Sequence, residues 1–508
     1  MLSQVEIAKL INYIEENLRT TTKTQNTFID PQGFLDRLKT KQNHVVFGRR
    51  GAGKSLLTTS LLKDDSTNVI YINLEDFKDI SFPNIIIRVL SKLIDELRML
   101  TKQKTYWFNL KAFRLCRNLG KEKRKIDKLI SEPDQVQKDI RTREELSAKS
   151  KAQMKNVAGG VESQVGVKTE EEIQKSIVEN KLEELRKELT SYKSYFEDAS
   201  YFLKSAPIFL ILDDFYFIPK TIQPEFIDYF HRLTKDTDLF VKVATIKHRS
   251  KLYKQTQQSY IGTEVGADIL DIDLDYTLDK FSTLKSFMHN LLEEAKRKSG
   301  ANIEVNTLFM GDGFSQLCLA SGGVPRDFLS LFVNLGNKLI SGELHSIGKI
   351  QVTDSAIENI GNKMGSFKTD SAEEREALET YLGEIRNYVY TEKRTNTFLV
   401  SKPELEVFPF ERQAIRELVD LRLVHLLNHN TSCAPSDGKR YEAYMLDIGL
   451  YENSRPRNFN QTEPDDIDEN ARKDKLRSSP KLALQKLKDK ITETGVSNGL
   501  QLSDEGNS

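Results

Sequence analysis

The sequence has few of the features that mark secreted, disulfide-bonded or membrane proteins. Its 508 residues include three cysteines, Cys116, Cys318 and Cys433, which stand far apart and form no C-x-x-C pair. This odd number of isolated cysteines argues against a disulfide framework or a zinc site and favours a reducing compartment. No apolar run approaches the roughly 18 residues of a membrane helix, and the polar N-terminus does not resemble a signal peptide. We therefore expect a cytoplasmic protein with no membrane partner.

The chain also has no excess of charge of either sign. Basic and acidic residues number 75 each, and the net charge is zero. No global electrostatic field therefore draws the protein toward nucleic acid or an anionic membrane, and any such surface must be a local patch. The charged fraction of 30% and the aromatic fraction of 9% are typical of a soluble, helix-rich protein. The length leaves room for about two to four domains.

A glycine-rich segment near the N-terminus is the most informative part of the sequence. It follows an apolar run that ends at Phe47, and Leu56 begins a helix-forming run behind it. Strand, glycine turn and helix are the context that the G-x-x-x-x-G-K-[ST] pattern requires. The residues of this phosphate loop are Gly48, Arg49, Arg50, Gly51, Ala52, Gly53, Lys54 and Ser55.

These residue types suit a nucleoside triphosphate. Glycines let backbone N–H groups surround phosphate oxygens without a Cβ clash, and the N-terminus of the following helix directs its positive end to the same place. Lys54 is expected to reach the β- and γ-phosphates, and the Ser55 hydroxyl to hold Mg²⁺. The alternative is a glycine-rich turn with no ligand, which the flanking strand and helix disfavour. We predict nucleoside triphosphate binding.

A second buried strand, residues 208–212, ends in two acids, Asp213 and Asp214. Parallel strands present their carboxyl ends to the active site. Asp213 is placed to hold Mg²⁺ opposite Ser55, and Asp214 to orient or deprotonate the attacking water. The alternative is a strand that ends in a solvated acidic turn. The phosphate loop earlier in the chain favours the catalytic interpretation.

Polar residues at two later positions are further site candidates. Thr245 ends the strand 239–245 and could bond the γ-phosphate or the attacking water, although ordinary strand-end polarity explains it nearly as well. Arg326 follows Pro325 at an expected helix start, where a cation opposes the helix dipole by a few tenths of a kcal/mol unless an anion lies nearby. Asp327 could supply that anion. We favour a bound γ-phosphate, which would make Arg326 a nucleotide sensor.

The pattern of apolar residues predicts an α/β protein of several parts. Residues 101–200 form a charged insertion in the P-loop core. This insertion is either a helical hairpin throughout or, over residues 121–156, a solvated linker. Leu484, Leu487 and Ile491 could form a short docking helix in an otherwise disordered tail. The expected parts are an N-terminal helix in 1–27, a P-loop core in 28–280 with the insertion at 101–200, a helical lid in 281–370, a small unit in 371–451 and the tail in 452–508.

The small unit is predicted to be a winged helix. Its order of helix, helix, strand, turn and strand matches that of winged helix-turn-helix domains. The second helix carries acidic and basic residues in near balance, which is a poor footprint for phosphate. Only Lys439 and Arg440 in the turn are locally basic. DNA contact and protein docking are both open for this unit.

Taken in order, these motifs resemble those of AAA+ ATPases of the origin-recognition initiator type and of the related signal-transduction (STAND) ATPases. The resemblance covers about residues 28–451 apart from the insertion. It implies that residues 48–55 are Walker A, that Asp213 and Asp214 are Walker B, and that Thr245 and Arg326 are sensors one and two. It also implies ATP with Mg²⁺, and a P-loop NTPase fold with a helical lid and a C-terminal winged helix.

Three departures from the initiator pattern bear on activity. Asp214 stands where initiators carry Glu, which implies slow hydrolysis, and Thr245 stands where they carry Asn. The insertion belongs to neither family's core. A trans-acting arginine is not evident, and Arg232 and Arg249 are only candidates.

We therefore expect an ATP-binding and hydrolysing switch whose nucleotide state controls homo-oligomerisation or the binding of a protein effector. One alternative is an initiator-like ATPase that binds DNA through the winged helix. Another is a regulatory scaffold of a defence or signalling system that recruits a separate effector.

Overall fold

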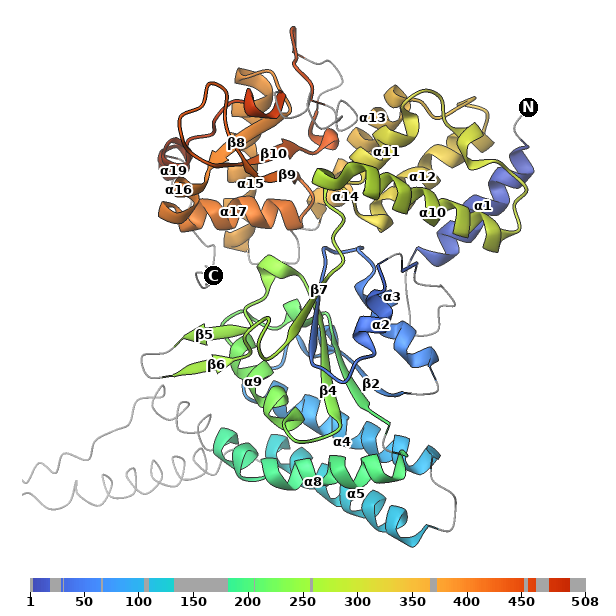
Figure 1. Cartoon of the computed structure of the whole chain (residues 1–508), viewed down its shortest axis with the longest axis vertical. Coiled ribbons are helices and arrows are strands. Elements are labelled where there is room, and N and C mark those ends of the chain that lie inside the picture. Colours follow the sequence, from blue (N-terminus) through green and yellow to red (C-terminus); the bar gives the residue numbers. More distant parts are fainter. Residues whose placement is uncertain are drawn as a thin grey trace, which may run out of the picture.

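The computed structural model describes most of the chain, and every structural statement below concerns the residues that it describes. The names of the predicted parts are kept below as labels: the P-loop core is called the ATPase core, and the small unit is called the winged helix. The ATPase core lies in the middle of the molecule, a helical layer lies at one end, and the lid and the small unit lie together at the other end (Figure 1). The described segments are residues 3–18, 29–30, 32–64, 67–104, 109–131, 181–204, 206–255, 259–365, 372–451, 456–462 and 475–493.

A five-stranded parallel sheet forms the centre of the ATPase core. The strand order is β2-β3-β4-β1-β7, so that β4 lies between the strand of the phosphate loop, β1, and the strand of the acid pair, β3. All six residues of β3 are buried, as its apolar sequence predicts. The chain therefore has the predicted α/β P-loop NTPase fold. The strands are β1 His44–Phe47, β2 Asn68–Asn73, β3 Ile208–Asp213, β4 Leu239–Thr245 and β7 Leu270–Asp273.

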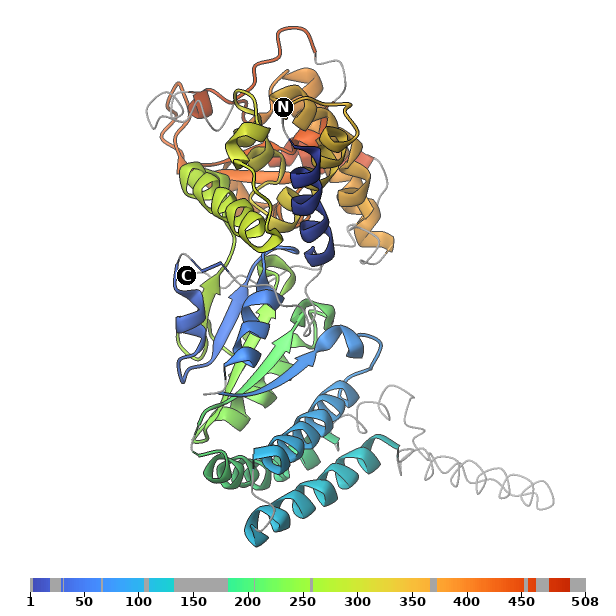
Figure 2. The ribbon, with the colours of Figure 1, turned by 90° about the vertical axis from the view of Figure 1, so that its right-hand side faces the viewer.

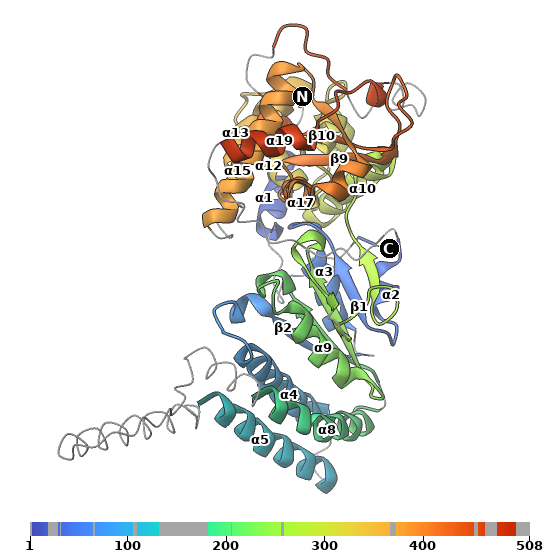
Figure 3. The same ribbon diagram turned by 90° about the vertical axis from the view of Figure 1, so that its left-hand side faces the viewer.

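Helices cover both faces of this sheet. On one face, α2 (Phe34–Leu38) and α3 (Lys54–Ser60) bury Leu38 and Leu57 against β3 and β4. On the other face lie α4 (Asn84–Lys104), α8 (Leu189–Phe202) and α9 (Gln223–Thr234), and α5 (Leu110–Ser131) packs on α4 and α8 (Figure 3). A short hairpin, β5 (Tyr253–Gln255) and β6 (Tyr260–Gly262), was not expected, because three-residue strands leave too little alternation to detect.

The insertion is helical wherever it is described. The structure places α5 and α8 in it, which agrees with the helical interpretation, and residues 121–131 of the proposed charged linker are helix. Leu185, Tyr192 and Phe196 are buried. Residues 132–180, with the rest of the linker, lie outside the described part of the chain.

The lid contains α10 (Phe281–Ser299), α11 (Gly313–Ala320), α12 (Pro325–Ile340), α13 (Lys349–Glu358) and α14 (Ile360–Met364). The N-terminal helix α1 (Gln4–Asn17) packs on α10 and α12 and so is part of the lid layer. The approach is close at Gly336, where a Cβ atom would lie 2.3 Å from Ile11 Cδ1. The sequence predicted this helix and its apolar face but not where it packs.

The small unit has the element order of a winged helix, with two elements that the sequence analysis missed. The predicted order has no element between its two helices, but the apolar run Thr397–Ser401 forms β8 there, and Lys402–Val407, with Pro at its start, forms α16. The sheet is antiparallel in the order β8-β10-β9. The elements are α15 Ala372–Arg386, continued by a π-helical turn Asn387–Glu392, β8 Thr397–Ser401, α16 Lys402–Val407, α17 Pro409–Asp420, β9 Val424–Thr431 and β10 Tyr441–Leu446.

The prediction of a disordered tail is wrong for the two tail segments that are described. Residues 475–493 pack on the winged helix, where Leu399 of β8 exchanges backbone hydrogen bonds with this segment. The suggested docking helix is α19 (Leu484–Glu493), whose three apolar residues are buried. The polar average composition of the tail indicated disorder, whereas the spacing of these three apolar residues indicated the helix.

The buried side chains divide the molecule into two bodies. One hydrophobic core joins α1, the lid, the winged helix and α19 without interruption. Two others fill the two faces of the ATPase sheet. The lid and the winged helix therefore share a core with each other and not with the ATPase core. Within the described residues, no helix is both long enough and apolar enough to cross a membrane.

Candidate functional site

The phosphate loop has the geometry that its glycines allow. Gly51 and Gly53 have φ of 93° and 102°, in the left-handed region that disfavours other residues. Gly53 directly precedes α3. Gly51 is also the point where the lid touches the loop, because a Cβ atom here would lie 2.8 Å from Arg326 Cβ. The backbone N–H of Arg326 donates to Gly51 O at 3.4 Å.

Lys54 is buried beneath this loop. Its Nζ donates to Gly48 O at 2.7 Å and to Arg49 O at 3.2 Å. Burial lowers the pKa of Lys54, and Asp214 and Asp213 oppose that shift. The ammonium group is thus held by carbonyls of its own loop, near the acid pair, where an arriving phosphate oxygen could replace those carbonyls.

The two arginines of the loop have different roles. Arg49 is buried, and its Nε donates to Asp275 at 3.2 Å and its Nη2 to Tyr276 O at 3.0 Å. It ties the loop to the segment that leads into the lid. Arg50 is exposed and lines the cavity described below, together with Gly51, Gly53, Lys54 and Ser55. Gly48, Arg49 and Ala52 do not line that cavity.

The acid pair at the end of β3 is held in a fixed arrangement. Asp213 is buried, and its Oδ2 accepts a 2.6 Å hydrogen bond from the Tyr71 hydroxyl of β2. Its Oδ1 accepts from the backbone N–H of Asp214 at 2.9 Å. Asp214 has a left-handed backbone, and burial and the neighbouring Asp213 raise its pKa to about 6. Tyr71 was not predicted, because a tyrosine in a strand gives no sign of its partner.

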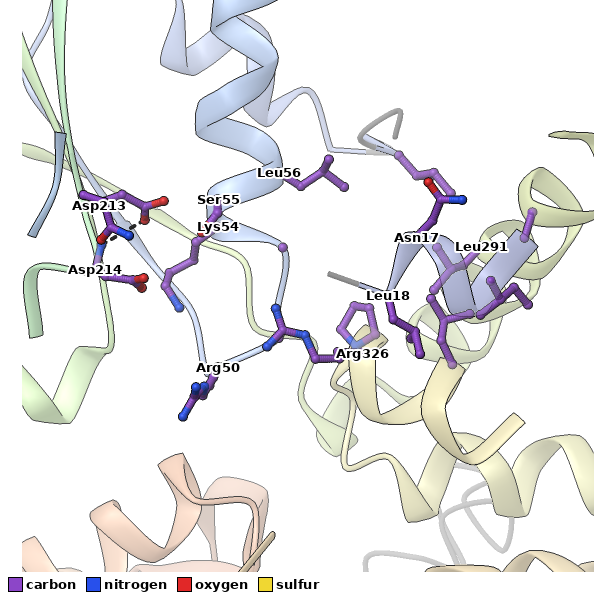
Figure 4. Close-up of a pocket in the computed structure, with 18 of the residues that line it drawn as sticks. Asn17, Leu18, Arg50, Lys54, Ser55, Leu56, Asp213, Asp214, Leu291 and Arg326 are labelled. Atoms are coloured by element: carbon purple, nitrogen blue, oxygen red, sulfur yellow. Dashed lines mark hydrogen bonds between the residues drawn. The ribbon is translucent and has the colours of Figure 1, made fainter. Parts of the chain in front are cut away.

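A cavity of about 370 Å³ lies between the ATPase core and the lid. At one end lie Lys54, Ser55 and the acid pair, and at the other lie Leu18 and Leu291, with Arg326 between the two ends (Figure 4). This volume is within the range of small-molecule sites. The apolar end comes from α1 and α10, which the sequence analysis did not connect with the site.

Arg326 is presented to this cavity from the first turn of α12. The Arg326 side chain is exposed to solvent. Burial and then the charge of Arg50 lower the pKa of Arg326, with Asp327 the largest opposing charge. Asp327 Oδ1 instead accepts a 2.6 Å hydrogen bond from Arg422 Nη1 of the winged helix. The alternative that Asp327 neutralises Arg326 therefore has no direct contact to support it.

The structure does not bring Thr245 into the cavity lining. Thr245 ends β4 as predicted, but it is buried and its hydroxyl is hydrogen-bonded to that of Ser250. Arg249 lines a separate cavity of about 20 Å³, next to Arg50 and Arg422. Arg232 bonds Asp228 on its own helix. The sequence could not decide between these roles, because strand-end polarity does not say which way a side chain points.

The winged helix is docked on the ATPase core through α17. Lys220 Nζ lies 3.0 Å from Glu417 Oε1, and both side chains are largely buried. Gln413 Nε2 donates to His248 O at 3.3 Å. Gln413, Glu417 and Asp420 of α17 are buried in this arrangement. The helix in the position of a recognition helix is therefore covered on this side by the ATPase core.

A buried polar cluster joins the winged helix to the lid. Asp447 Oδ2 accepts from Lys363 Nζ at 2.5 Å and pairs with His425 Nε2 at 2.8 Å. Lys363 and His425 favour the ionised form and hold the pKa of Asp447 at about 2 in spite of its burial. Because Lys363 of the lid and His425 of the winged helix both contact the Asp447 carboxylate, the cluster links the two parts next to their shared hydrophobic core.

The matches to known proteins come from solved structures. No family model matches the chain, and no curated protein sequence does. The chain is similar to a structure of Drosophila ORC bound to DNA, with 11% identity, 87% of this chain and 90% of that chain covered and a TM-score of 0.35. It is also similar to Aeropyrum pernix ORC1 in complex with DNA, with 12% identity, 88% of this chain and 90% of that chain covered and a TM-score of 0.33. For the Walker-type ATPase PABY2304 of Pyrococcus abyssi the identity is 12%, the coverage is 87% of this chain and 98% of that chain, and the TM-score is 0.40.

These identities and scores add nothing to the fold assignment, which rests on the strand order and the phosphate loop of this chain.

Proposed function

We propose that this protein is an ATP-binding and hydrolysing switch whose nucleotide state controls the docking of the winged helix. One observation carries the proposal. A single cavity brings together the phosphate loop, the acid pair and Arg326, and Arg326 belongs to the body that also contains α17. Nucleotide bound in this cavity would contact both bodies of the molecule.

The residues present fit ATP with Mg²⁺. Backbone N–H groups of the loop, with Lys54 and Arg326, offer donors and positive charge to phosphates at the polar end of the cavity. Ser55 and Asp213 are oxygen ligands suited to Mg²⁺, which would neutralise charge on the β- and γ-phosphates. The apolar side chains Leu18 and Leu291 suit a purine base at the other end.

The residues around the acid pair suggest slow hydrolysis. Asp214 is mainly ionised at neutral pH because its pKa is about 6, so its carboxylate can accept a proton from water. Its side chain is one methylene shorter than Glu, which limits its reach. Tyr71 keeps the Asp213 carboxylate in one orientation through its hydrogen bond. Lys54 must exchange Gly48 O for a phosphate oxygen.

The switch itself would be a movement of the lid and winged helix as one body. They share a core, and the segment 274–280, which leads from the sheet to the lid, is one joint between the two bodies. Arg49 holds that joint through Asp275 and Tyr276. A shift of Arg326 toward phosphate would move α17 relative to Lys220 and change how much of α17 is covered. Exposed α17 would then serve oligomerisation or partner binding.

A second candidate is an initiator-like ATPase that binds DNA through the winged helix. The observation that favours it is the wing, where Lys439 and Arg440 are exposed while α17 is docked. This candidate predicts an affinity for DNA that falls steeply with salt and is lost on charge reversal of Lys439 and Arg440.

The proposal is tested with Lys54→Ala and Asp214→Asn in the full chain. Lys54→Ala should weaken ATP binding by about 100-fold or more, because a charge-assisted contact to phosphate is lost. Asp214→Asn should keep ATP binding but lower turnover by about 10²- to 10⁴-fold. Lys41→Ala, an exposed lysine away from the cavity, is the control. A Lys54→Ala protein with full affinity and turnover would contradict the proposal.

The same turnover assay with double-stranded DNA separates the two candidates. Stimulation by DNA that disappears in Asp214→Asn supports the initiator-like ATPase. Slow turnover that is indifferent to DNA supports a switch that responds to a protein partner.

A further inference from the structure

A strongly basic surface lies on α5, at the opposite end of the molecule from the winged helix. Helix α5 carries eight basic and two acidic side chains, although the whole chain has no net charge. None of these residues takes part in the nucleotide cavity. The helix belongs to the insertion, so the ATPase fold does not account for it.

The charges on α5 are confined to one face. The opposite face is apolar and buries Ala112, Leu115, Leu119 and Ile126 against α4 and α8. Exposed basic residues recur in steps of three and four, so they are neighbours along the outer side. We call this surface the basic stripe; it consists of Lys111, Arg114, Arg117, Lys121, Arg124 and Lys128.

The acids near α5 are engaged elsewhere. Glu122 is buried and pairs with Lys125 at 3.0 Å, and Asp127 accepts a hydrogen bond from Ser91. From α4, Asp95 pairs with Lys123 at 3.0 Å. From the α8 side, Glu188 acts on Lys125. These acids therefore interact with Lys123, Lys125 or Ser91, none of which belongs to the basic stripe.

Four residues of the stripe are left uncompensated. Lys111, Arg114, Arg117 and Lys121 make no ion pair with any residue that the structure describes. Like charges three and four residues apart repel each other, so such a row is unfavourable for the helix by itself. An anionic partner would remove this repulsion.

The stripe is long, rigid and accessible. Helix α5 is the outermost layer of its end of the molecule, with α4 between it and the sheet (Figure 2). From Lys111 to Lys128 the stripe extends over about 26 Å at the rise of an α-helix. Exposed apolar side chains on α5 are confined to its first turn, where Leu110 is 82% and Phe113 is 71% exposed.

We propose that the basic stripe of α5 binds the phosphate backbone of duplex nucleic acid without reading its sequence. A rigid row of cations matches a regular row of phosphates, and it presents no arrangement of polar groups for reading bases. An anionic membrane also attracts a row of cations, but a helix that lies in a membrane surface buries apolar side chains along its length, and α5 offers them at one end only. The inference is independent of the proposed switch, because it uses no residue of the nucleotide cavity.

The test compares the full chain with the triple variant Arg114→Gln, Arg117→Gln, Lys121→Gln. The control variant, Lys41→Gln, Lys204→Gln, Lys235→Gln, removes the same charge from exposed sites elsewhere on the ATPase core. Binding to labelled DNA and RNA duplexes of about 30 base pairs and mixed sequence is measured across salt concentrations near 50–200 mM. ATP affinity and melting temperature show whether each variant keeps its fold.

The parent chain should bind with log K falling by about 5 per decade of salt, as expected for six phosphate contacts. The α5 variant should bind at least about tenfold more weakly at low salt, with the slope reduced by about 3, and the control variant should match the parent. ATP affinity should be unchanged in all three proteins. Binding of only one kind of duplex identifies that nucleic acid as the source of the backbone.

Three outcomes would overturn the proposal. One is a parent chain that binds neither duplex at low salt. Another is an α5 variant with the affinity and salt slope of the parent. The third is α5-dependent binding to vesicles with about 30% anionic lipid in the absence of duplex binding, which would make a membrane the partner. Because ATP affinity is measured alongside, failure here is distinguishable from failure of the switch.

Discussion

Helices α17 and α5 contrast in almost every respect that matters for binding. Helix α17 occupies the position of a recognition helix, but its charges nearly balance and it is covered by the ATPase core through Glu417 and Gln413. Helix α5 belongs to no such module, but its outer face is basic and open. Helix α17 lies on the side of the winged helix that faces the ATPase core, whereas α5 lies at the far end of the molecule (Figure 1).

The contrast shows that position in a fold and availability for binding are separate properties. The topology of a winged helix predicts where a contact could form, whereas exposure and uncompensated charge determine whether the contact can form in this state. We therefore expect α17 to depend on the nucleotide cycle and α5 to be independent of it.

The largest effect is expected on ATP turnover, when a change of pH acts on the nucleotide cycle and leaves both helices unaltered. The raised pKa of Asp214, about 6, means that its carboxylate becomes protonated as the pH falls below that value. A protonated carboxyl cannot accept a proton from water, so kcat/KM should fall about tenfold per pH unit below about pH 6 and level off above it. Steady-state ATP turnover from about pH 5 to pH 8 measures this.

This pH dependence should be absent from the residual turnover of Asp214→Asn. Duplex binding by α5 should not follow the same curve, because arginine and lysine keep their charge throughout this range. A turnover profile that is flat through pH 6 would exclude Asp214 as the proton acceptor.

A smaller effect is expected from the contact that covers α17. Lys220→Ala removes the partner of Glu417, which would leave a largely buried carboxylate uncompensated. Solvent screens part of this penalty, because Lys220 retains some exposure. We therefore expect the free energy needed to detach α17 from the ATPase core to fall by about 1–2 kcal/mol, which is about tenfold in the equilibrium constant. Hydrogen exchange of backbone amides in α17 should accelerate by that factor, and exchange in α5 should not change.

Lys204→Ala, which removes an exposed lysine of the same domain, is the control for this measurement. Equal acceleration in α17 and α5 would mean that the substitution loosens the ATPase core as a whole. In that case the Lys220–Glu417 contact would not act as a latch for α17.

The parts of the site that the sequence predicts are those that depend on neighbouring residues. The phosphate loop is one contiguous segment, and the strand before it and the helix after it determine its geometry locally. Asp213 and Asp214 follow from a short apolar run that ends in acids. Arg326 was predicted because a cation at a helix start needs an explanation, and it lines the cavity.

Other features depend on contacts between distant segments and could not be read from local patterns. The apolar face of α1 is evident in the sequence, but its contact with α12 and its place in the cavity are tertiary facts. Thr245 ends a strand as predicted, yet Ser250 engages it away from the cavity lining. In the same way, α19 gains its stability from the winged helix on which it packs.

The smallest effect should come from single charges at the two ends of the molecule. Arg117→Gln removes one contact of the basic stripe, so the salt slope for duplex binding should decrease by about 1 and the affinity should fall by a small factor at low salt. Lys439→Gln removes one exposed charge from the wing beside the docked α17 and should leave both quantities unchanged. Matched salt titrations of the two variants decide the comparison directly. If only Lys439→Gln lowers the slope, duplex nucleic acid binds at the winged helix, and topology rather than open charge identifies the binding surface.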